Sequence, residues 1–291
     1  MNSSKSEDQT EISIDVPREE KNNVPHGGKK IDRYVLSPNM KCIASESYED
    51  KSFVVWSITD ELIVNYDSSL NVNDLEHALN TDKFCKTPDF NFENTFYRQL
   101  LGISNCKQVI IKLFDFNFAI DFAIIDIRTK LRQILTAQGL EGETKSVAFL
   151  ENEDLVVIKL RPVYRGYIFS KSNINGKQKW TCKNSIELEK RFEECYISKK
   201  GKLFMGFNIT TMPIVMQWDL ITRKFDMKYI LDLNLNIFAI KMELNSDYTL
   251  LAIGGGKIGG GGYGYVVCVY LTKSAKASQL LLDQIRSSKL K

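Results

Sequence analysis

The sequence predicts an all-β fold built from several copies of one strand-rich unit, and three observations support this prediction. A polar turn motif recurs along the chain, apolar residues alternate at period two beside the turns, and helical periodicity is weak almost everywhere. The alternation is clear in Val109-Ile111-Leu113 and in Tyr265-Val267-Val269, and it is typical of strands. Hydrophobic residues make up 43% of the 291-residue chain, which is enough to form a packed core.

The recurring unit starts with a polar turn between two strands. Its five copies are 67, 46, 48 and 47 residues apart and begin at Ser37, Ser104, Leu150, Ser198 and Asn245. In every copy a polar residue stands four positions later, namely Lys41, Gln108, Asp154, Lys202 and Thr249. A later strand of each copy ends in a bulky apolar residue, namely Trp56, Ile125, Phe169, Trp218 and Tyr270. A period of roughly 40–50 residues is that of four-stranded propeller blades, so we expect about five blades in a propeller that is either closed, incomplete or open.

Composition divides the chain into three parts. Residues 1–30 are polar and are expected to form a disordered tail without a secretory signal. Residues 31–285 are expected to form the propeller-like domain, and residues 286–291 a C-terminal tail. The long first interval predicts an insertion near residues 60–95, which either forms a short helix or loop or hides an eroded blade strand.

The segment from His26 to Ile58 resembles a WD40 repeat. In that family a His opens the unit, a turn of the SPxxK type follows the first inner strand, and an Asp precedes a Trp by six residues. This sequence has His26, the turn at residues 37–41, Asp50 and Trp56 close to those positions. The resemblance implies a buried polar network of His26, Ser47, Asp50 and Trp56, with a structural and non-catalytic role.

Further resemblance comes from the fourth unit, which contains the Trp218-Asp219 dipeptide that gives the WD40 family its name. This unit lacks the turn aspartate, because Met212 stands six positions before Trp218. The amino-acid sequence of the first unit is also similar to that of a group of fungal propeller-like proteins. Some longer members of that group continue into an ion-transport membrane domain.

The glycine-rich segment at residues 254–264 contains a nominal GxGxxG at Gly254, Gly256 and Gly259. A dinucleotide-binding fold needs a helix directly after this motif, and here a further apolar strand follows. The segment therefore predicts a hairpin loop between two blade strands, and no cofactor is expected. A ligand-gripping loop, with Lys257 as an anion contact, is the alternative.

Other chemistry finds little support in the sequence. The net charge of +3 argues against nucleic acid as a partner, and the apolar stretch at residues 109–127 is too often interrupted by polar residues to span a membrane. The two histidines, His26 and His77, stand in polar segments, so we expect no catalytic residues and no metal site. Six cysteines without a CxxC pair are typical of reduced thiols in a cytoplasmic protein.

These patterns favour a non-enzymatic scaffold that binds other proteins through a WD40-like propeller. Trp180, which stands among lysines, is a candidate contact for a partner, unless its ring folds onto the blade edge. Open blade edges would also permit self-association. Two alternatives remain at this point: a cytosolic sensor portion of a larger membrane protein of the ion-channel type, and a propeller enzyme.

Overall fold

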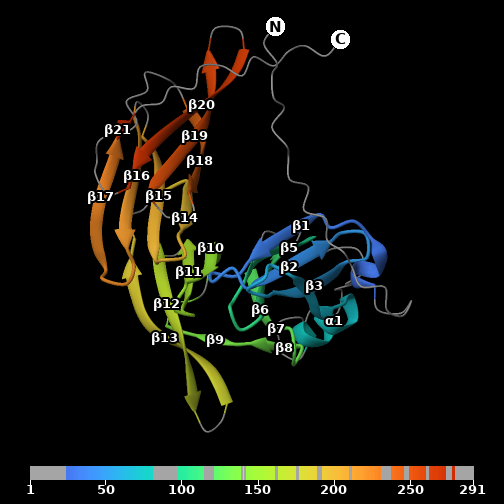
Figure 1. Cartoon of the computed structure of the whole chain (residues 1–291). Coiled ribbons are helices and arrows are strands. Elements are labelled where there is room, and N and C mark those ends of the chain that lie inside the picture. The colour runs from blue at the N-terminus through green and yellow to red at the C-terminus, as the bar shows by residue number, and fades with distance from the viewer. Residues whose placement is uncertain are drawn as a thin grey trace, which may run out of the picture.

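The computed structural model of the chain contains five sheets that follow one another along an arc (Figure 1). The structure describes residues 24–80, 97–114, 121–138, 140, 142–160, 163–174, 177–188, 192–209, 212–230, 237–245, 249–259, 262–272 and 277–278. Within each sheet, consecutive strands pair in antiparallel fashion, so every sheet is a meander. The predicted all-β, WD40-like propeller fold is confirmed.

The first sheet consists of β1 (Arg33–Leu36), β2 (Cys42–Ser47), β3 (Ser52–Ile58) and β4 (Val64–Leu70). The second consists of β5 (Tyr97–Ile103), β6 (Gln108–Phe114), β7 (Asp121–Asp126) and β8 (Leu131–Gln133). The third consists of β10 (Glu143–Phe149), β11 (Leu155–Leu160), β12 (Arg165–Ile174) and β13 (Lys177–Glu187), with β9 (Leu135–Thr136) added at its edge. The fourth consists of β14 (Glu194–Ile197), β15 (Lys202–Ile209), β16 (Met212–Asp219) and β17 (Lys224–Ile230). The fifth consists of β18 (Ile237–Leu244), β19 (Leu250–Gly259), β20 (Gly262–Leu271) and β21 (Ala277–Ser278).

All five predicted turns lie directly after the first strand of a sheet, so the repeat read from the sequence is the sheet repeat. The side chains of Ser37, Ser104 and Ser198 accept hydrogen bonds from backbone N–H groups at the start of the next strand, at 2.9–3.0 Å. The fourth residue of the turn has a positive φ in the first four sheets, at Met40, Lys107, Glu153 and Gly201. Polar side chains at turn starts and left-handed residues at turn ends are what such tight connections require.

Each pair of consecutive sheets encloses its own apolar core. Four clusters of buried side chains fill the spaces between the first and second, second and third, third and fourth, and fourth and fifth sheets. None of the clusters of described residues joins the fifth sheet to the first, and Figure 1 shows these two sheets at separate ends of the arc. The arc is therefore open, which was one of the predicted alternatives.

The insertion after the first sheet contains α1 (Val72–Asn80). Asn71 caps this helix reciprocally: its Oδ1 accepts from the backbone N–H of Asp74, and Asp74 Oδ2 accepts from the N–H of Asn71, which is a strong helix start. Leu75 and Leu79 are buried in the core between the first and second sheets. The helix alternative is therefore confirmed, and residues 81–96 lie outside the described part of the chain.

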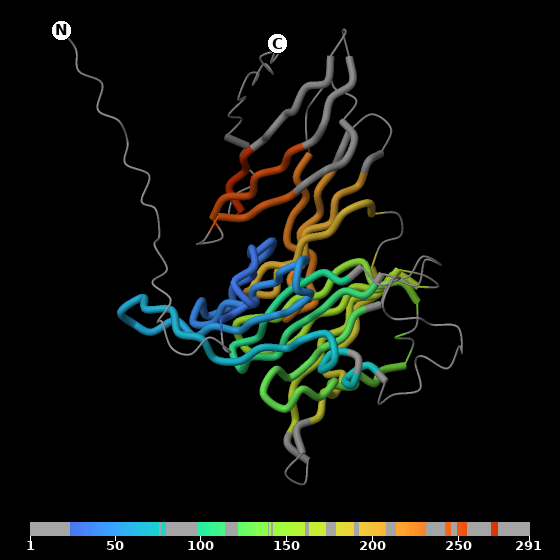
Figure 2. Tube along the Cα trace, turned by 90° about the vertical axis from the view of Figure 1, so that its right-hand side faces the viewer, coloured from blue at the N-terminus to red at the C-terminus, as the bar shows by residue number. Residues whose placement is uncertain are grey.

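Three features of the structure differ from the sequence prediction or add to it. Pro25–Gly28 form a short 3-10 helix, η1, so the ordered domain begins before residue 31. The predicted glycine-rich hairpin forms, but its glycines belong to the paired ends of β19 and β20. The strands β12 and β13 extend beyond the rest of their sheet (Figures 1 and 2). Most of the predicted tails, residues 1–23 and 286–291, lies outside the described residues.

Candidate functional site

His26 is the centre of a buried polar network on the first sheet. Its Nδ1 lies 2.6 Å from Ser52 Oγ, and its Nε2 lies 2.8 Å from Ser45 Oγ. The Trp56 indole N–H donates to Ser45 Oγ at 2.9 Å, and Ser52 Oγ donates to the Asp50 carboxylate at 2.8 Å. The network brings together residues from η1, β2, β3 and the β2–β3 turn. Three of the four residues implied by the WD40 resemblance, namely His26, Asp50 and Trp56, therefore meet as expected.

Ser47 is not part of this network, so its predicted role is wrong. Its side chain is fully buried, and its hydroxyl has no hydrogen-bond partner among the described residues. Ser45 and Ser52 fill the place that was assigned to it. Ser45 and Ser47 share one face of β2, because alternate residues of a strand point the same way, and only Ser45 lies opposite the His26 ring.

A neutral imidazole completes the network when Trp56 donates to Ser45, Ser45 donates to Nε2 of His26, Nδ1–H donates to Ser52, and Ser52 donates to Asp50. A proton added at Nε2 would turn the Ser45 hydroxyl away, toward the more distant Val54 carbonyl oxygen at 3.4 Å. Burial lowers the pKa of His26 below its usual value, and the charge of Asp50 opposes this only in part. The folded state therefore holds His26 neutral.

We predict that this histidine makes stability dependent on pH. The unfolded state takes up the proton near pH 6.5, the ordinary pKa, whereas the folded state takes it up only at lower pH. The contribution of His26 is thus complete above pH 6.5 and declines as the pH falls toward the lowered pKa. Urea unfolding at several pH values, for the wild type and His26→Gln, measures this contribution as the difference between the two proteins.

The comparison with His26→Gln is needed because Glu46 titrates in the opposite sense. Burial raises the pKa of Glu46, so its contribution declines as the pH rises above the ordinary value for a glutamate. Subtracting the variant removes that effect. A difference between wild type and His26→Gln that stays constant from about pH 8 to pH 5 would contradict a neutral, buried His26.

Trp218 and Asp219 are brought together with Lys202 at the end of the fourth sheet. Asp219 Oδ1 accepts from the backbone N–H groups of Ile221 and Thr222 at 2.8 and 2.9 Å, and its Oδ2 accepts from Lys202 Nζ at 2.9 Å. The indole N–H of Trp218 is buried and has no hydrogen-bond partner among the described residues. Asp219 is therefore a turn-closing residue, and this sheet lacks the network of the first.

Trp180 is buried, so of its two alternatives, a partner contact or a ring folded onto the sheet, the structure has the second. Its side chain is 1% exposed and belongs to the core between the second and third sheets. The ring packs 6.2 Å from that of Phe149, and Lys171 Nζ lies 5.1 Å from the ring centre. A ring in this position offers no surface to a partner. The side chain of Lys257 lies outside the described residues, and its anion contact stays a prediction.

An apolar surface that the sequence analysis missed lies on the side of the first sheet that faces away from the second sheet. Four cross-strand neighbours form a row on it: Leu36, Ile43, Trp56 and Tyr66. The next pair along β3 and β4, Ile58 and Val64, points the same way and is partly exposed. We call these six residues the free face. Tyr66 is 45% exposed, and its ring meets that of Trp56 edge-on.

Among the described residues, no group of three or more His, Cys, Asp or Glu side chains is placed to hold a metal ion. None of the described helices is long and apolar enough to span a bilayer. A mixed apolar and aromatic row such as the free face is suited to burial against another protein surface.

No protein-family model matches the sequence, and no curated protein matches it. Among solved structures, the hydrazine synthase of Kuenenia stuttgartiensis aligns with a TM-score of 0.49 at 9% identity, over 86% of this chain and 66% of that one. The Dos1 propeller aligns with a TM-score of 0.44 at 11% identity, over 84% and 58%. The Cps50 (Swd1) β-propeller domain of Myceliophteria thermophila aligns with a TM-score of 0.44 at 12% identity, over 76% and 66%.

The chain thus spans about three fifths to two thirds of these three chains. The meander of each sheet, the shared turn chemistry and the network of His26, Ser45, Asp50 and Trp56 are features of this chain itself. Together they make the molecule an open arc of five propeller-type β-sheets, the first of which resembles a WD40 repeat.

Proposed function

We propose that the protein is a non-enzymatic scaffold, and that its free face binds an apolar β-sheet surface of a partner protein. The exposure of the free face carries this proposal. Tyr66 is 45% exposed, and four other side chains of this face are only partly buried, which leaves apolar surface in water at a free-energy cost. Contiguous apolar patches on soluble proteins mark interaction surfaces.

The chemistry of the partner follows from the other sheets. The second, third and fourth sheets have a core cluster on both sides, each formed by the apolar face of a neighbouring sheet. The first sheet has such a cluster on one side only. Because the free face repeats the cross-strand apolar row that fills those cores, a sheet with an apolar face is the surface that fits it best.

The rim of the free face also suits a protein partner. Tyr66 provides a rigid aromatic surface with a polar atom, which is the kind of side chain that dominates binding energy at interfaces, and the buried Trp56 ring supports it edge-on. The indole N–H of Trp56 is already bonded within the sheet, whereas the Tyr66 hydroxyl donates to Ser69 at 3.3 Å near the surface. Tyr66 is therefore available at the rim.

The test compares two exposed aromatic residues at equivalent positions of their sheets. Tyr66 lies opposite Trp56 on the free face and is 45% exposed, and Phe225 lies opposite Trp218 in the fourth sheet and is 47% exposed. Tyr66→Asp should weaken partner binding on the order of tenfold or more, because it buries a charge in the interface. Phe225→Asp should leave binding unchanged. Both variants should fold, since both positions are at the surface.

Quantitative affinity purification from cells that express wild type, Tyr66→Asp or Phe225→Asp is the measurement. Proteins that are lost with Tyr66→Asp and retained with Phe225→Asp are the partners that the proposal requires. Equal recovery of every captured protein with both variants would contradict the free face as the docking surface.

A further inference from the structure

A cavity of about 220 Å³ lies between the second and third sheets. Its walls are Leu101 and Lys112 with Phe122 from the second sheet, and Thr144, Lys145, Ser146 and Val147 from the third. This cavity is separate from the free face, which lies on the other side of the first sheet. It lies beside the apolar core that fills the rest of the contact between these two sheets.

Two β-bulges account for the space. The pairing of β5 with β6 shifts register between Leu100 and Gly102, and the pairing of β10 with β11 shifts between Thr144 and Ser146. The extra residues are Leu101 and Lys145, and both line the cavity. A bulge bends its strand and redirects side chains. The first strands of the two sheets therefore diverge where the cavity opens.

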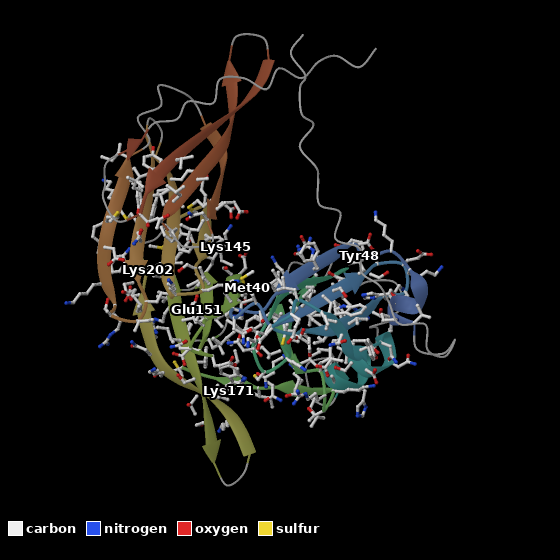
Figure 3. The ribbon with its side chains drawn as sticks, viewed as in Figure 1. Met40, Tyr48, Lys145, Glu151, Lys171 and Lys202 are labelled. Carbon is white, nitrogen blue, oxygen red and sulfur yellow. The ribbon has the colours of Figure 1, made fainter. Side chains whose placement is uncertain are left out.

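The polar lining is basic and donates hydrogen bonds. Lys112 and Lys145 are close enough that the charge of Lys145, together with burial, lowers the pKa of Lys112. Lys145 Nζ lies 3.5 Å from Glu194 Oε1, and Glu143 and Glu194 oppose the shift of Lys112 only in part. Two lysines held side by side, one of them half-buried, favour an anion between them. Figure 3 shows Lys145 on β10 in the middle of the arc.

Thr144 provides the second, independent observation. Its side chain is 5% exposed and lines the cavity, and its hydroxyl is buried with no hydrogen-bond partner among the described residues. A buried hydroxyl without a partner is costly. Such groups are rare in folded proteins and call for an explanation such as an unfilled ligand position. A bound acceptor oxygen in the cavity would satisfy the Thr144 hydroxyl.

We propose that this cavity binds a small organic anion, with a carboxylate or phosphate held by Lys112, Lys145 and Thr144 and an apolar body held by Leu101, Phe122 and Val147. The volume limits the ligand to one ring or a short chain, since pockets for drug-sized ligands begin at about 300 Å³. The ligand joins the second sheet to the third, so it stabilises their contact by binding the folded state alone.

Calorimetric titration of the full chain with four probes tests the proposal. Benzoate and phenyl phosphate should bind and raise the melting temperature, and the stronger of the two identifies the preferred anionic group. Benzyl alcohol, which has the same ring without the charge, should bind at least tenfold more weakly. Inorganic phosphate, which lacks the ring, should also bind more weakly. No binding of either aromatic anion at millimolar concentration, or equal binding of benzyl alcohol, would overturn the proposal.

Two variants separate binding from folding. Thr144→Val keeps the shape and removes the unpaired hydroxyl, so the ligand-free protein should melt about 2 °C higher and bind the preferred anion about threefold to tenfold more weakly. Lys145→Gln should weaken binding at least tenfold. Lys228→Gln, at an exposed position on β17, removes the same charge elsewhere and should bind like the wild type. Unchanged binding by Thr144→Val, or equal losses for the two lysine variants, would refute the site.

Discussion

Replacing Trp180 by alanine should destabilise the fold by about 3–5 kcal/mol. The ring is 1% exposed and fills the core between the second and third sheets, where it packs against Phe149. Its removal leaves a cavity, because the close-packed side chains and paired strands around it cannot easily move in to fill the space. Because domains are commonly stable by about 5–15 kcal/mol, the loss should be visible as a large shift of the urea midpoint.

Trp180→Phe is the matched control for this prediction. The Trp180 indole N–H is buried and has no hydrogen-bond partner among the described residues, so phenylalanine removes a polar atom that contributes nothing while it keeps most of the ring. We expect Trp180→Phe to cost no more than about 1.5 kcal/mol. If Trp180→Ala unfolded at the wild-type urea concentration, the ring would have to lie at the surface, as its sequence neighbours suggest.

The candidate partner contact at Trp180 shows what local sequence context leaves open on a strand. The neighbours Lys179 and Lys183 are exposed, and this suggested an exposed segment. On β13, however, adjacent side chains point to opposite faces, so Lys179 belongs to the solvent side and Trp180 to the core side. In addition, β9 pairs with β13 at Trp180 and Thr181, and this parallel contact joins residues that are far apart in the sequence.

The repeat itself was predictable because its signals are local. A polar residue that caps a turn and the apolar strand that follows it are read within a dozen residues, and all five predicted turns lie in the expected place. The free face and the anion cavity had no comparable signal. Tyr66 is exposed because none of the described sheets covers this face, and the cavity depends on the bulges at Leu101 and Lys145.

The polar network of the first sheet was predictable in part. The WD40 resemblance identified His26, Asp50 and Trp56, since these residue types recur at recognisable spacings. It did not distinguish Ser45 from Ser47, because both lie on the same face of β2 and the choice depends on where η1 places the His26 ring. The two serines therefore provide a test of the network, because they differ in little besides their hydrogen-bond partners.

Ser45→Ala should destabilise the protein by about 2–4 kcal/mol. The Ser45 hydroxyl accepts from the Trp56 indole at 2.9 Å and bonds His26 Nε2 at 2.8 Å. Alanine leaves both nitrogen atoms buried without a partner, and each such group costs about 1–3 kcal/mol. Urea unfolding followed by Trp fluorescence measures the loss, and the environment of Trp56 should change with it.

Ser47→Ala, two residues along the same strand, should be neutral or stabilising, within about 0.5–1 kcal/mol. Both serines are buried at 1% exposure or less. Each substitution therefore removes one oxygen atom from an equally buried position. Only the Ser45 substitution leaves hydrogen-bond partners unpaired, because the Ser47 hydroxyl has no partner among the described residues in the wild type. A larger loss for Ser47→Ala than for Ser45→Ala would mean that the WD40-type network runs through Ser47 after all. The order of these two stabilities therefore decides which hydroxyl connects Trp56 to His26.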